Sequence, residues 1–315
     1  MRTFDTNIGG LHFSGYIYNA AGPKDATYEE LVPIAASASV AITMKSCTLE
    51  ARDGNPEPRY AFTAEPYGSI SASGLPNLGY KAYIELAARI KREFPNKPVV
   101  ASVAGLALDE FAILVEAFQH SQSDMIEVNL HSCPKEKGKQ QLAHDVEGIE
   151  KVLTAIMKLG KKPVGVKLPM YSDIDHIETL ATLFKKHGVA FISTVSSVSP
   201  ALVIDAETET ALIKPKAGIG GMGGSYVKPF ALANVRAFAQ LLQDTSVSVV
   251  GVGGVRTGKD VFDFLLAGAD AVQIGTTFYE EGPQCFQRVA VEFASIMEHK
   301  GYNCISDAKG KLKLL

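Results

Sequence analysis

Short apolar runs rich in β-branched residues recur along the chain, and a helical pattern follows most of them. The runs lie at residues 15–22, 39–46, 97–105, 124–130, 162–169, 189–197, 246–254 and 269–277. Continuously apolar strands that alternate with amphipathic helices indicate a parallel sheet that is buried on both faces. Eight such units in 315 residues predict an α/β fold of the (β/α)8 TIM-barrel type. A doubly wound open sheet is the alternative.

Two stretches, residues 46–77 and 197–229, are longer than ordinary connections between a strand and the next helix. Both follow the carboxyl end of a predicted strand, so we expect long loops that arch over the C-terminal mouth of the barrel. Residues 1–315 contain no Pro- or Ser-rich linker and no low-complexity tract. The chain is therefore expected to form a single domain.

Charge and cysteine usage exclude several classes of protein. The net charge of −3 offers no electrostatic basis for binding nucleic acid or an anionic membrane. The first residues lack the pattern of a signal peptide, and no segment approaches the ~18 apolar residues of a membrane span. No CxxC pair or metal-ligand spacing occurs among the cysteines at 47, 133, 285 and 304. We expect a cytoplasmic protein that holds no metal.

Two lysines stand at the ends of nearly apolar predicted strands. Lys45 lies in VAITMKS and Lys167 in VGVKLP. Asn129 ends DMIEVN, a predicted strand that lies between these two in the sequence. A lysine is costly to bury without an anionic partner, so an anionic cofactor or an electron-rich ring in the mouth would account for both. The alternative is that each lysine reaches solvent at a strand edge.

Glycines follow the last two predicted strands. Gly253-Gly254 ends the seventh, and Gly275-Thr276 ends the eighth. Barrels of this kind often bind phosphate there, because glycine lets backbone N–H groups approach the anion; the alternative is two tight turns. The run GIGGMGG (218–224) could lie against a flat ring or form a flexible lid.

Cys133 follows the fourth predicted strand in the sequence SCPKEKGK. A free cysteine is commonly a buried, inert apolar residue. This segment is polar, contains a proline and is rich in lysine, which favours an accessible thiol with a lowered pKa. Cys133 is therefore the candidate reactive residue of the mouth.

Motifs along the whole chain, in order, resemble a known enzyme family. They include NAAG, TMKSCT, GNPEPRY, SGLPNLG, EVNL with SCP, VGVKLP, IKPK with GIGGMGG, ALANVRAF, AVQIGT and KGKLK. The chain resembles the soluble, cytosolic dihydroorotate dehydrogenases, most closely the homodimeric class that uses FMN and passes electrons to fumarate. The resemblance implies oxidation of (S)-dihydroorotate to orotate in the biosynthesis of pyrimidines (UMP).

The resemblance also implies a set of roles. Cys133 would be the base that removes a proton from C5 of dihydroorotate, while hydride moves from C6 to flavin N5. FMN would contact Ala20, Ala21, Gly22, Lys45, Ser46, Asn129, Lys167, Ser196, Gly223, Gly224, Gly253, Gly254, Gly275 and Thr276. The substrate would contact Lys45, Ser71, Ser73, Gly74, Leu75, Asn129, Lys135, Ser196 and Ser197.

Several positions of the implied substrate shell differ from the family's pattern. Ser71, Ser196 and Lys135 stand where the family has asparagines that pair with the pyrimidine edge. One extra residue, His131, precedes Ser132-Cys133. These differences leave open two alternatives: a flavoenzyme of this architecture that acts on another small (dihydro)heterocycle or anionic substrate, and a non-catalytic FMN-binding paralogue.

Overall fold

Eight parallel strands form the centre of the molecule in a computed structural model that describes residues 4–63, 67–131 and 141–315. Their hydrogen-bonded order gives a nearly closed barrel, as the sequence predicts, and not an open doubly wound sheet. In this order the strands are β3 (Ile17–Asn19), β16 (Ala271–Ile274), β15 (Ser248–Val252), β10 (Phe191–Thr194), β9 (Val164–Leu168), β8 (Met125–Asn129), β7 (Val99–Val103) and β4 (Ile42–Thr43).

The seam between β3 and β4 is closed by a side chain. Asn19 Nδ2 donates to the Thr43 carbonyl at 2.7 Å, and the Thr43 N–H donates to Asn19 Oδ1 at 2.8 Å. One further backbone bond crosses the seam, from Val40 N–H to the Ile17 carbonyl. The fully buried amide of Asn19 thus takes the place of a strand-to-strand pair, because it offers both a donor and an acceptor.

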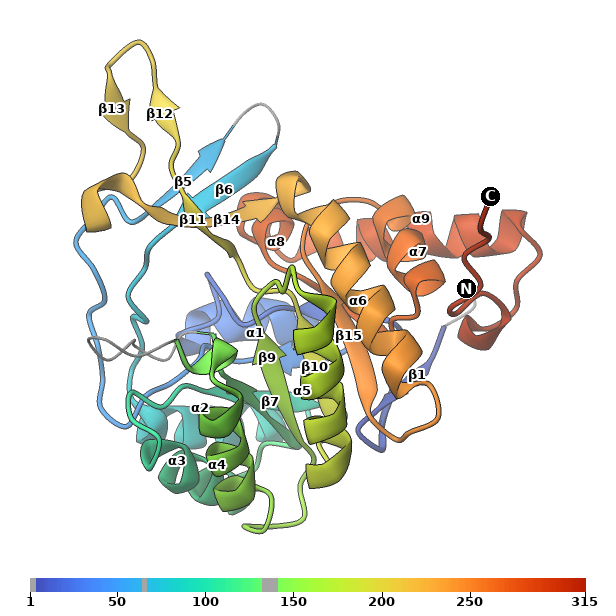
Figure 1. Ribbon diagram of the computed structural model, residues 1–315, viewed down its shortest axis with the longest axis horizontal. Helices are drawn as coiled ribbons and strands as arrows, with labels where there is room; N and C mark the ends of the chain where they lie inside the picture. Colours follow the sequence, from blue (N-terminus) through green and yellow to red (C-terminus); the bar gives the residue numbers. More distant parts are fainter. Residues whose placement is uncertain (1–3, 64–66, 132–140) are drawn as a thin grey trace.

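Helices follow the strands and cover the outside of the barrel (Figure 1). Of these, α2 and α6 follow the two long stretches. The helices are α1 (Tyr28–Ala36), α2 (Tyr80–Glu93), α3 (Glu110–Gln119), α4 (Val146–Ile156), α5 (Ile174–His187), α6 (Lys228–Leu242), α7 (Gly258–Ala267), α8 (Thr276–Glu281) and α9 (Gln284–His299). In the described part of the chain, none of them has the length and apolar character needed to cross a membrane.

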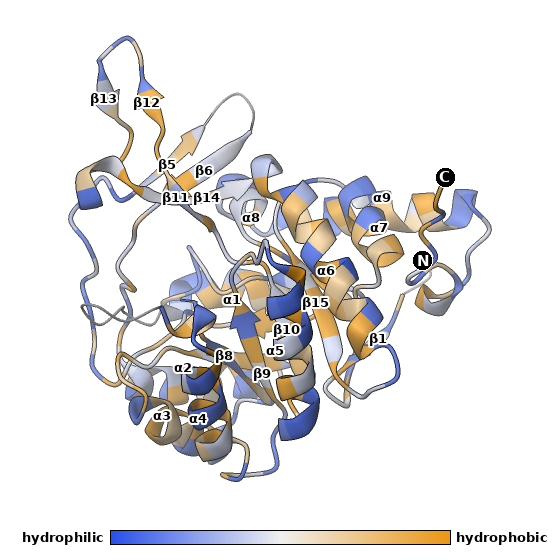
Figure 2. Cartoon of the chain, viewed as in Figure 1, coloured by the Kyte–Doolittle hydropathy of each residue, from blue (hydrophilic) through white to orange (hydrophobic). Residues whose placement is uncertain are grey.

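The core lies between the barrel and its helices, where apolar strand residues meet the apolar stripe of each helix (Figure 2). A second apolar cluster fills the amino-terminal end of the barrel interior. It includes Ile8 and Phe13 from the hairpin of β1 (Thr6–Ile8) and β2 (Leu11–Phe13), which pack with Tyr18 and Phe191. The amino-terminal end is thereby closed, which leaves the carboxyl end as the open mouth.

The two long stretches meet above this mouth, as expected, but as a sheet and not as loops alone. They supply a four-stranded antiparallel sheet in the order β11 (Val198–Ala201), β14 (Gly220–Gly224), β6 (Gly68–Ser71) and β5 (Tyr60–Thr63). A hairpin of β12 (Ile204–Asp205) and β13 (Thr210–Ala211) projects beyond it (Figure 1). We call the carboxyl ends of the eight parallel strands the floor, and this sheet with residues 71–75 and 196–197 the roof.

Candidate active site

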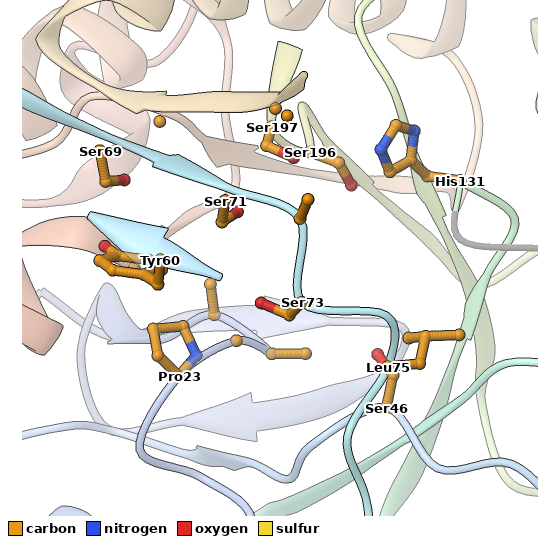
Figure 3. A pocket seen from close by; sticks show the side chains of 18 of the residues that line it. Pro23, Ser46, Tyr60, Ser69, Ser71, Ser73, Leu75, His131, Ser196 and Ser197 are labelled. Atoms are coloured by element: carbon orange, nitrogen blue, oxygen red, sulfur yellow. The ribbon is translucent and has the colours of Figure 1, made fainter. Parts of the chain in front are cut away.

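A cavity of about 1250 Å³ lies between the floor and the roof. Figure 3 shows side chains of both converging on it. Two of the site residues expected from the sequence, Cys133 and Lys135, lie outside the described residues. All the others line the cavity: Ala20, Ala21, Gly22, Lys45, Ser46, Ser71, Ser73, Gly74, Leu75, Asn129, Lys167, Ser196, Ser197, Gly223, Gly224, Gly253, Gly254, Gly275 and Thr276.

Both lysines are held by polar atoms of the floor. Lys45 Nζ donates to the Gly22 carbonyl at 2.6 Å. Lys167 is only 5% exposed, and its Nζ donates to Gln273 Oε1 at 3.1 Å. Burial lowers the pKa of Lys167, although the carboxylate of Glu127 opposes the shift. Lys167 therefore does not extend to bulk solvent at a strand edge, and an anionic ligand in the cavity would stabilise its charged form.

A polar network supports Lys167 from inside the barrel. Gln273 Nε2 donates to Glu127 Oε2 at 3.3 Å, and Ser193 Oγ donates to the same oxygen at 2.5 Å. The second oxygen, Glu127 Oε1, is buried and has no hydrogen-bond partner. The sequence interpretation missed Gln273 and Glu127, although each is a polar residue inside an apolar run. A search for polar residues at the inward-facing positions of the apolar strands would have identified both.

Asn129, at the end of β8, belongs to a second polar group of the floor. Its Nδ2 donates to Ser46 Oγ at 3.1 Å, and Ser46 Oγ lies 2.8 Å from Ser102 Oγ. Register places Asn129 beside Lys167 on the neighbouring strand. An amide, a hydroxyl and an ammonium group therefore lie next to one another along three strand ends, where they can bind a polar ligand edge.

Asp25 is a buried carboxyl group just outside the cavity. Its Oδ2 accepts from the Gly22 N–H at 2.6 Å, whereas Oδ1 has no partner. Burial raises the pKa of Asp25 to about 7, and the nearby Lys45 partly offsets this. Asp25 thus fixes the Gly22 turn and faces the charge of Lys45, a role that the sequence interpretation did not assign.

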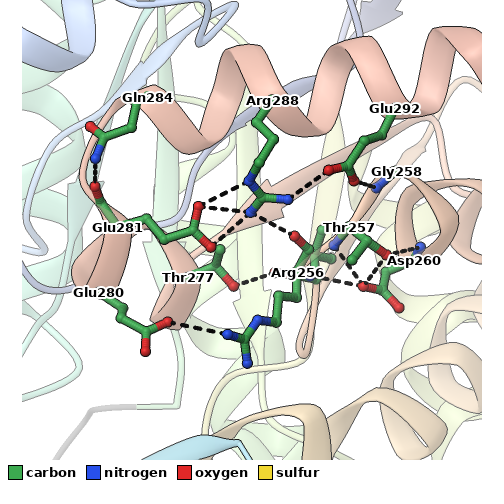
Figure 4. A network of polar contacts seen from close by, with 11 residues as sticks. Arg256, Thr257, Gly258, Asp260, Thr277, Glu280, Glu281, Gln284, Arg288 and Glu292 are labelled. Atoms are coloured by element: carbon green, nitrogen blue, oxygen red, sulfur yellow. Dashed lines mark hydrogen bonds and ion pairs between the residues drawn. The ribbon is translucent and has the colours of Figure 1, made fainter.

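The two glycine turns expected to bind phosphate lie side by side and are joined by a dense polar network (Figure 4). Thr277 Oγ1 donates to the Val255 carbonyl at 2.7 Å, linking the turn after β16 to the turn after β15. Arg288, from α9, donates to Glu281, Glu292 and the Arg256 carbonyl. The network fixes the relative position of the two turns at the same edge of the floor.

Gly254 shows why glycine is required in this edge. Its φ is +75°, and a Cβ placed on it would lie 2.7 Å from Lys228 Cβ and 2.8 Å from the Gly224 carbonyl oxygen. A side chain there would be strained in its backbone and would collide with a neighbour. The bare backbone leaves room for a ligand to approach the N–H groups, which favours an anion site.

The glycine run of residues 218–224 is a strand for most of its length and not a lid. As β14 it pairs with β6 on one side, with Gly221 opposite Ser71, and with β11 on the other. Four of its glycines line the cavity, so their backbone forms a side-chain-free surface suited to a flat ring.

The roof side chains are small hydroxyls. Ser71, Ser73, Ser196 and Ser197 are half-buried, and each lines the cavity (Figure 3). Between Ser73 and Leu75 the chain turns through Gly74, whose φ of +74° and close approach to Asn55 exclude a side chain. The hydroxyls can donate or accept hydrogen bonds, but they are shorter than amides and reach less far into the cavity.

Two other cysteines are unsuited to be the reactive thiol. Cys47 and Cys285 are both completely buried. Burial raises the pKa of each thiol. Thiolates are the reactive form, so neither residue offers a nucleophile or a base. Cys133 is the cysteine whose place in the sequence, after β8, suits chemistry in the mouth.

These features define a (β/α)8-barrel protein with a large cavity, lined by lysines and bare glycine backbone, at the carboxyl ends of its strands. The edge with two glycine turns suits a phosphate, the bare β14 backbone suits a flat ring, and the lysines suit negative charge. The donor set therefore fits a flavin mononucleotide, and the class defined is that of a barrel oxidoreductase.

The chain belongs to the dihydroorotate dehydrogenase family, since the family model described as dihydroorotate dehydrogenase matches residues 3–297. A protein of Streptococcus uberis named "Putative dihydroorotate dehydrogenase A (fumarate)" is 46% identical over 98% of both chains. One of Enterococcus faecalis, named "Probable dihydroorotate dehydrogenase A (fumarate)", is 43% identical over 96% of this chain and 98% of that protein.

Solved structures agree on the fold. The crystal structure described as ligand-free type DHODH from Eimeria tenella superposes on this chain with a TM-score of 0.83 at 19% sequence identity. The superposition covers 98% of this chain and 91% of that one. At this identity the likeness concerns the barrel architecture alone. The family consists of flavin-dependent oxidoreductases that act on CH–CH bonds, in agreement with the donor set of the cavity.

Proposed function

We propose that this protein oxidises (S)-dihydroorotate to orotate in pyrimidine (UMP) biosynthesis, with FMN as its cofactor and fumarate as the electron acceptor. The observation that carries the proposal is the full-length match to relatives named for this reaction, combined with a cavity lined by every described residue of the expected site. These matches favour dihydroorotate over another heterocycle and over a non-catalytic paralogue. We further propose that residues 1–315 act as one domain, in a cytoplasmic homodimer.

The floor and β14 are the proposed cofactor site. Residues at the ends of β3, β4, β8 and β9 would contact the ring, β14 would lie along it, and the turns at 253–254 and 275–276 would hold the phosphate. When bound, FMN supplies the acceptor for the hydride that leaves C6 of the substrate. Lys45 and Lys167 would bring positive charge to the part of the ring that becomes electron-rich.

The roof would hold the substrate on the side of the cavity opposite the floor. Lys45 and Asn129 present an ammonium and an amide, while Ser71, Ser73 and Ser196 present hydroxyls. On sequence grounds Cys133 would take the proton from C5, and Lys135 would contact the substrate. A substrate bound beneath the roof would have its reacting carbons shielded from water.

An anaerobic titration tests this proposal. The purified protein should be yellow, and (S)-dihydroorotate should bleach its flavin absorption within seconds; fumarate should then restore the colour. Flavin that stays oxidised at millimolar dihydroorotate would refute the proposed substrate. A bleached protein that fumarate fails to reoxidise would refute the proposed acceptor only.

The role of Cys133 has its own test. A Cys133→Ser variant should bleach about 100-fold or more slowly at pH 7, because a hydroxyl is a far weaker base than a thiolate, whereas FMN binding should be unchanged. Cys285→Ser, which alters a completely buried cysteine of α9 that does not line the cavity, is the matched control. Equal rates for wild type and Cys133→Ser would remove the thiol from the mechanism.

A further inference from the structure

His131, two residues after the end of β8, lies in the cavity wall (Figure 3). The pairing of β8 with β9 continues past Asn129, because the Leu130 N–H donates to the Lys167 carbonyl at 3.2 Å. Leu130 is completely buried in the core, whereas Asn129 and His131 on either side of it both line the cavity. His131 extends the polar surface of the floor by one step towards the roof.

One nitrogen of the His131 imidazole is an unpaired hydrogen-bonding atom among the residues that the structure describes. This atom, Nδ1, is buried. Burial lowers the pKa of His131 to about 4, and the nearby Lys167, His144 and Lys216 add to the shift. The ring is neutral at physiological pH, so it offers one donor and one acceptor. Unlike His176 on α5, which also has a buried nitrogen without a hydrogen-bond partner, His131 lines the cavity, so a ligand bound there can complete the pairing.

Ser196 faces the same region from the other side of β9. The Ser196 N–H donates to the Leu168 carbonyl at 2.8 Å. On the opposite side of β9, the Leu130 N–H donates to the carbonyl of Lys167, the residue before Leu168. His131 and Ser196 thus flank the end of β9, and both line the cavity. A short hydroxyl at 196 leaves space that a longer side chain from the β8 side can occupy.

We infer that His131 is a specificity-determining residue that hydrogen-bonds, through its neutral imidazole, the polar edge of a carboxylated ring substrate lying over Asn129. This inference rests on the proposed function. In this protein the imidazole supplies a planar donor and acceptor group where serines at 71 and 196 fall short. The cations Lys45 and Lys216, which also line the cavity, suit the carboxylate of the same ligand.

Ligand binding to the flavin-loaded protein tests the inference. Orotate is titrated into wild type, His131→Phe and His131→Gln, and the dissociation constant is read from the shift of the flavin spectrum and by calorimetry. His131→Phe keeps a planar ring without nitrogen atoms and should weaken orotate binding about tenfold. His131→Gln retains a planar donor and acceptor and should stay within about threefold of wild type. The affinity for FMN should be the same in all three.

A control variant separates this role from a general effect of removing a histidine. His176, on α5, also has a buried nitrogen without a partner, yet it packs against Tyr171 and is absent from the cavity lining. His176→Phe should leave orotate binding unchanged. Orotate binding by His131→Phe equal to wild type, or equal weakening in His131→Phe and His131→Gln, overturns the inference.

The outcomes also separate this inference from the proposed function. Wild type that binds orotate but is not bleached by dihydroorotate refutes the proposed reaction, while the comparison of variants still decides the role of His131. Wild type that fails to bind orotate overturns both. Wild type that is bleached normally, with His131→Phe binding orotate equally well, overturns the role of His131 alone.

Discussion

The floor and the roof of the cavity are built in opposite ways. Floor side chains such as Lys167 and Asn129 are buried, and they bond to Gln273 and Ser46, on or just after strands that are not their immediate neighbours in the barrel. Roof side chains such as Ser71 and Ser196 are half-buried, and Ser71 stands on a small antiparallel sheet contributed by long connections. The floor is part of the folding core, so its geometry is fixed by strand register, whereas the roof can change its side chains at little cost to the barrel.

The largest difference between floor and roof is expected in stability. Asn19→Ala should lower the free energy of unfolding by about 3 kcal/mol, because it leaves the buried N–H and C=O of Thr43 unpaired at the seam. Asn55→Ala is the matched change at the roof, because the Asn55 side chain donates to the carbonyl of the half-buried roof residue Ala72 at 2.7 Å; it should cost about 1 kcal/mol. Urea unfolding measures the free energy of unfolding of both variants. Equal losses in the two variants would contradict the proposed difference between floor and roof.

A second comparison concerns the cofactor. Lys167→Ala should weaken FMN binding about 100-fold, since it removes a buried charge from the ring site. Lys162→Ala alters a lysine at the other end of the same strand, where it donates to the Phe118 and Ser121 carbonyls, and should not affect FMN. Fluorescence of released FMN measures both constants. Unchanged FMN binding in Lys167→Ala would show that the floor is not the cofactor site.

A third prediction concerns the energetic cost of charge beside the floor. Since burial raises the pKa of Asp25 to about 7, the folded protein binds an extra proton between about pH 4 and 7, and stability falls as pH rises through that window. Asn imitates the protonated carboxyl group. Asp25→Asn should therefore stabilise the protein by about 2 kcal/mol at pH 8, with a gain that shrinks towards pH 4. A gain independent of pH in urea titrations would contradict this account.

The smallest effect is expected from a change in the roof alone. Ser71→Asn should tighten orotate binding about fivefold, because a longer amide reaches the ligand edge with both a donor and an acceptor. The affinity for FMN and the free energy of unfolding should stay as in wild type, since Ser71 is half-buried and outside the floor. Weaker orotate binding in this variant would indicate that the imidazole of His131 already fills that space.

Much of the floor could be predicted from the sequence. Eight apolar runs imply a barrel, and residues at the ends of parallel strands must meet at one mouth, so Lys45, Asn129, Lys167 and the glycine turns could be grouped without coordinates. Gln273 and Glu127 were missed because a single polar residue in an otherwise apolar strand is easily assumed to have no functional role. Only the structure shows that both side chains lie inside the barrel, where Gln273 bonds to both Lys167 and Glu127.

The sequence by itself determined the barrel, its family and the set of residues at the mouth, because strand periodicity and motif order are local properties of the chain. Only the tertiary structure decided how the two long stretches pair, how the Asn19 amide closes the seam, and that His131 lines the cavity with an unpaired nitrogen. Those features depend on register between strands distant in the sequence. A shift of one residue would turn each side chain to the opposite face.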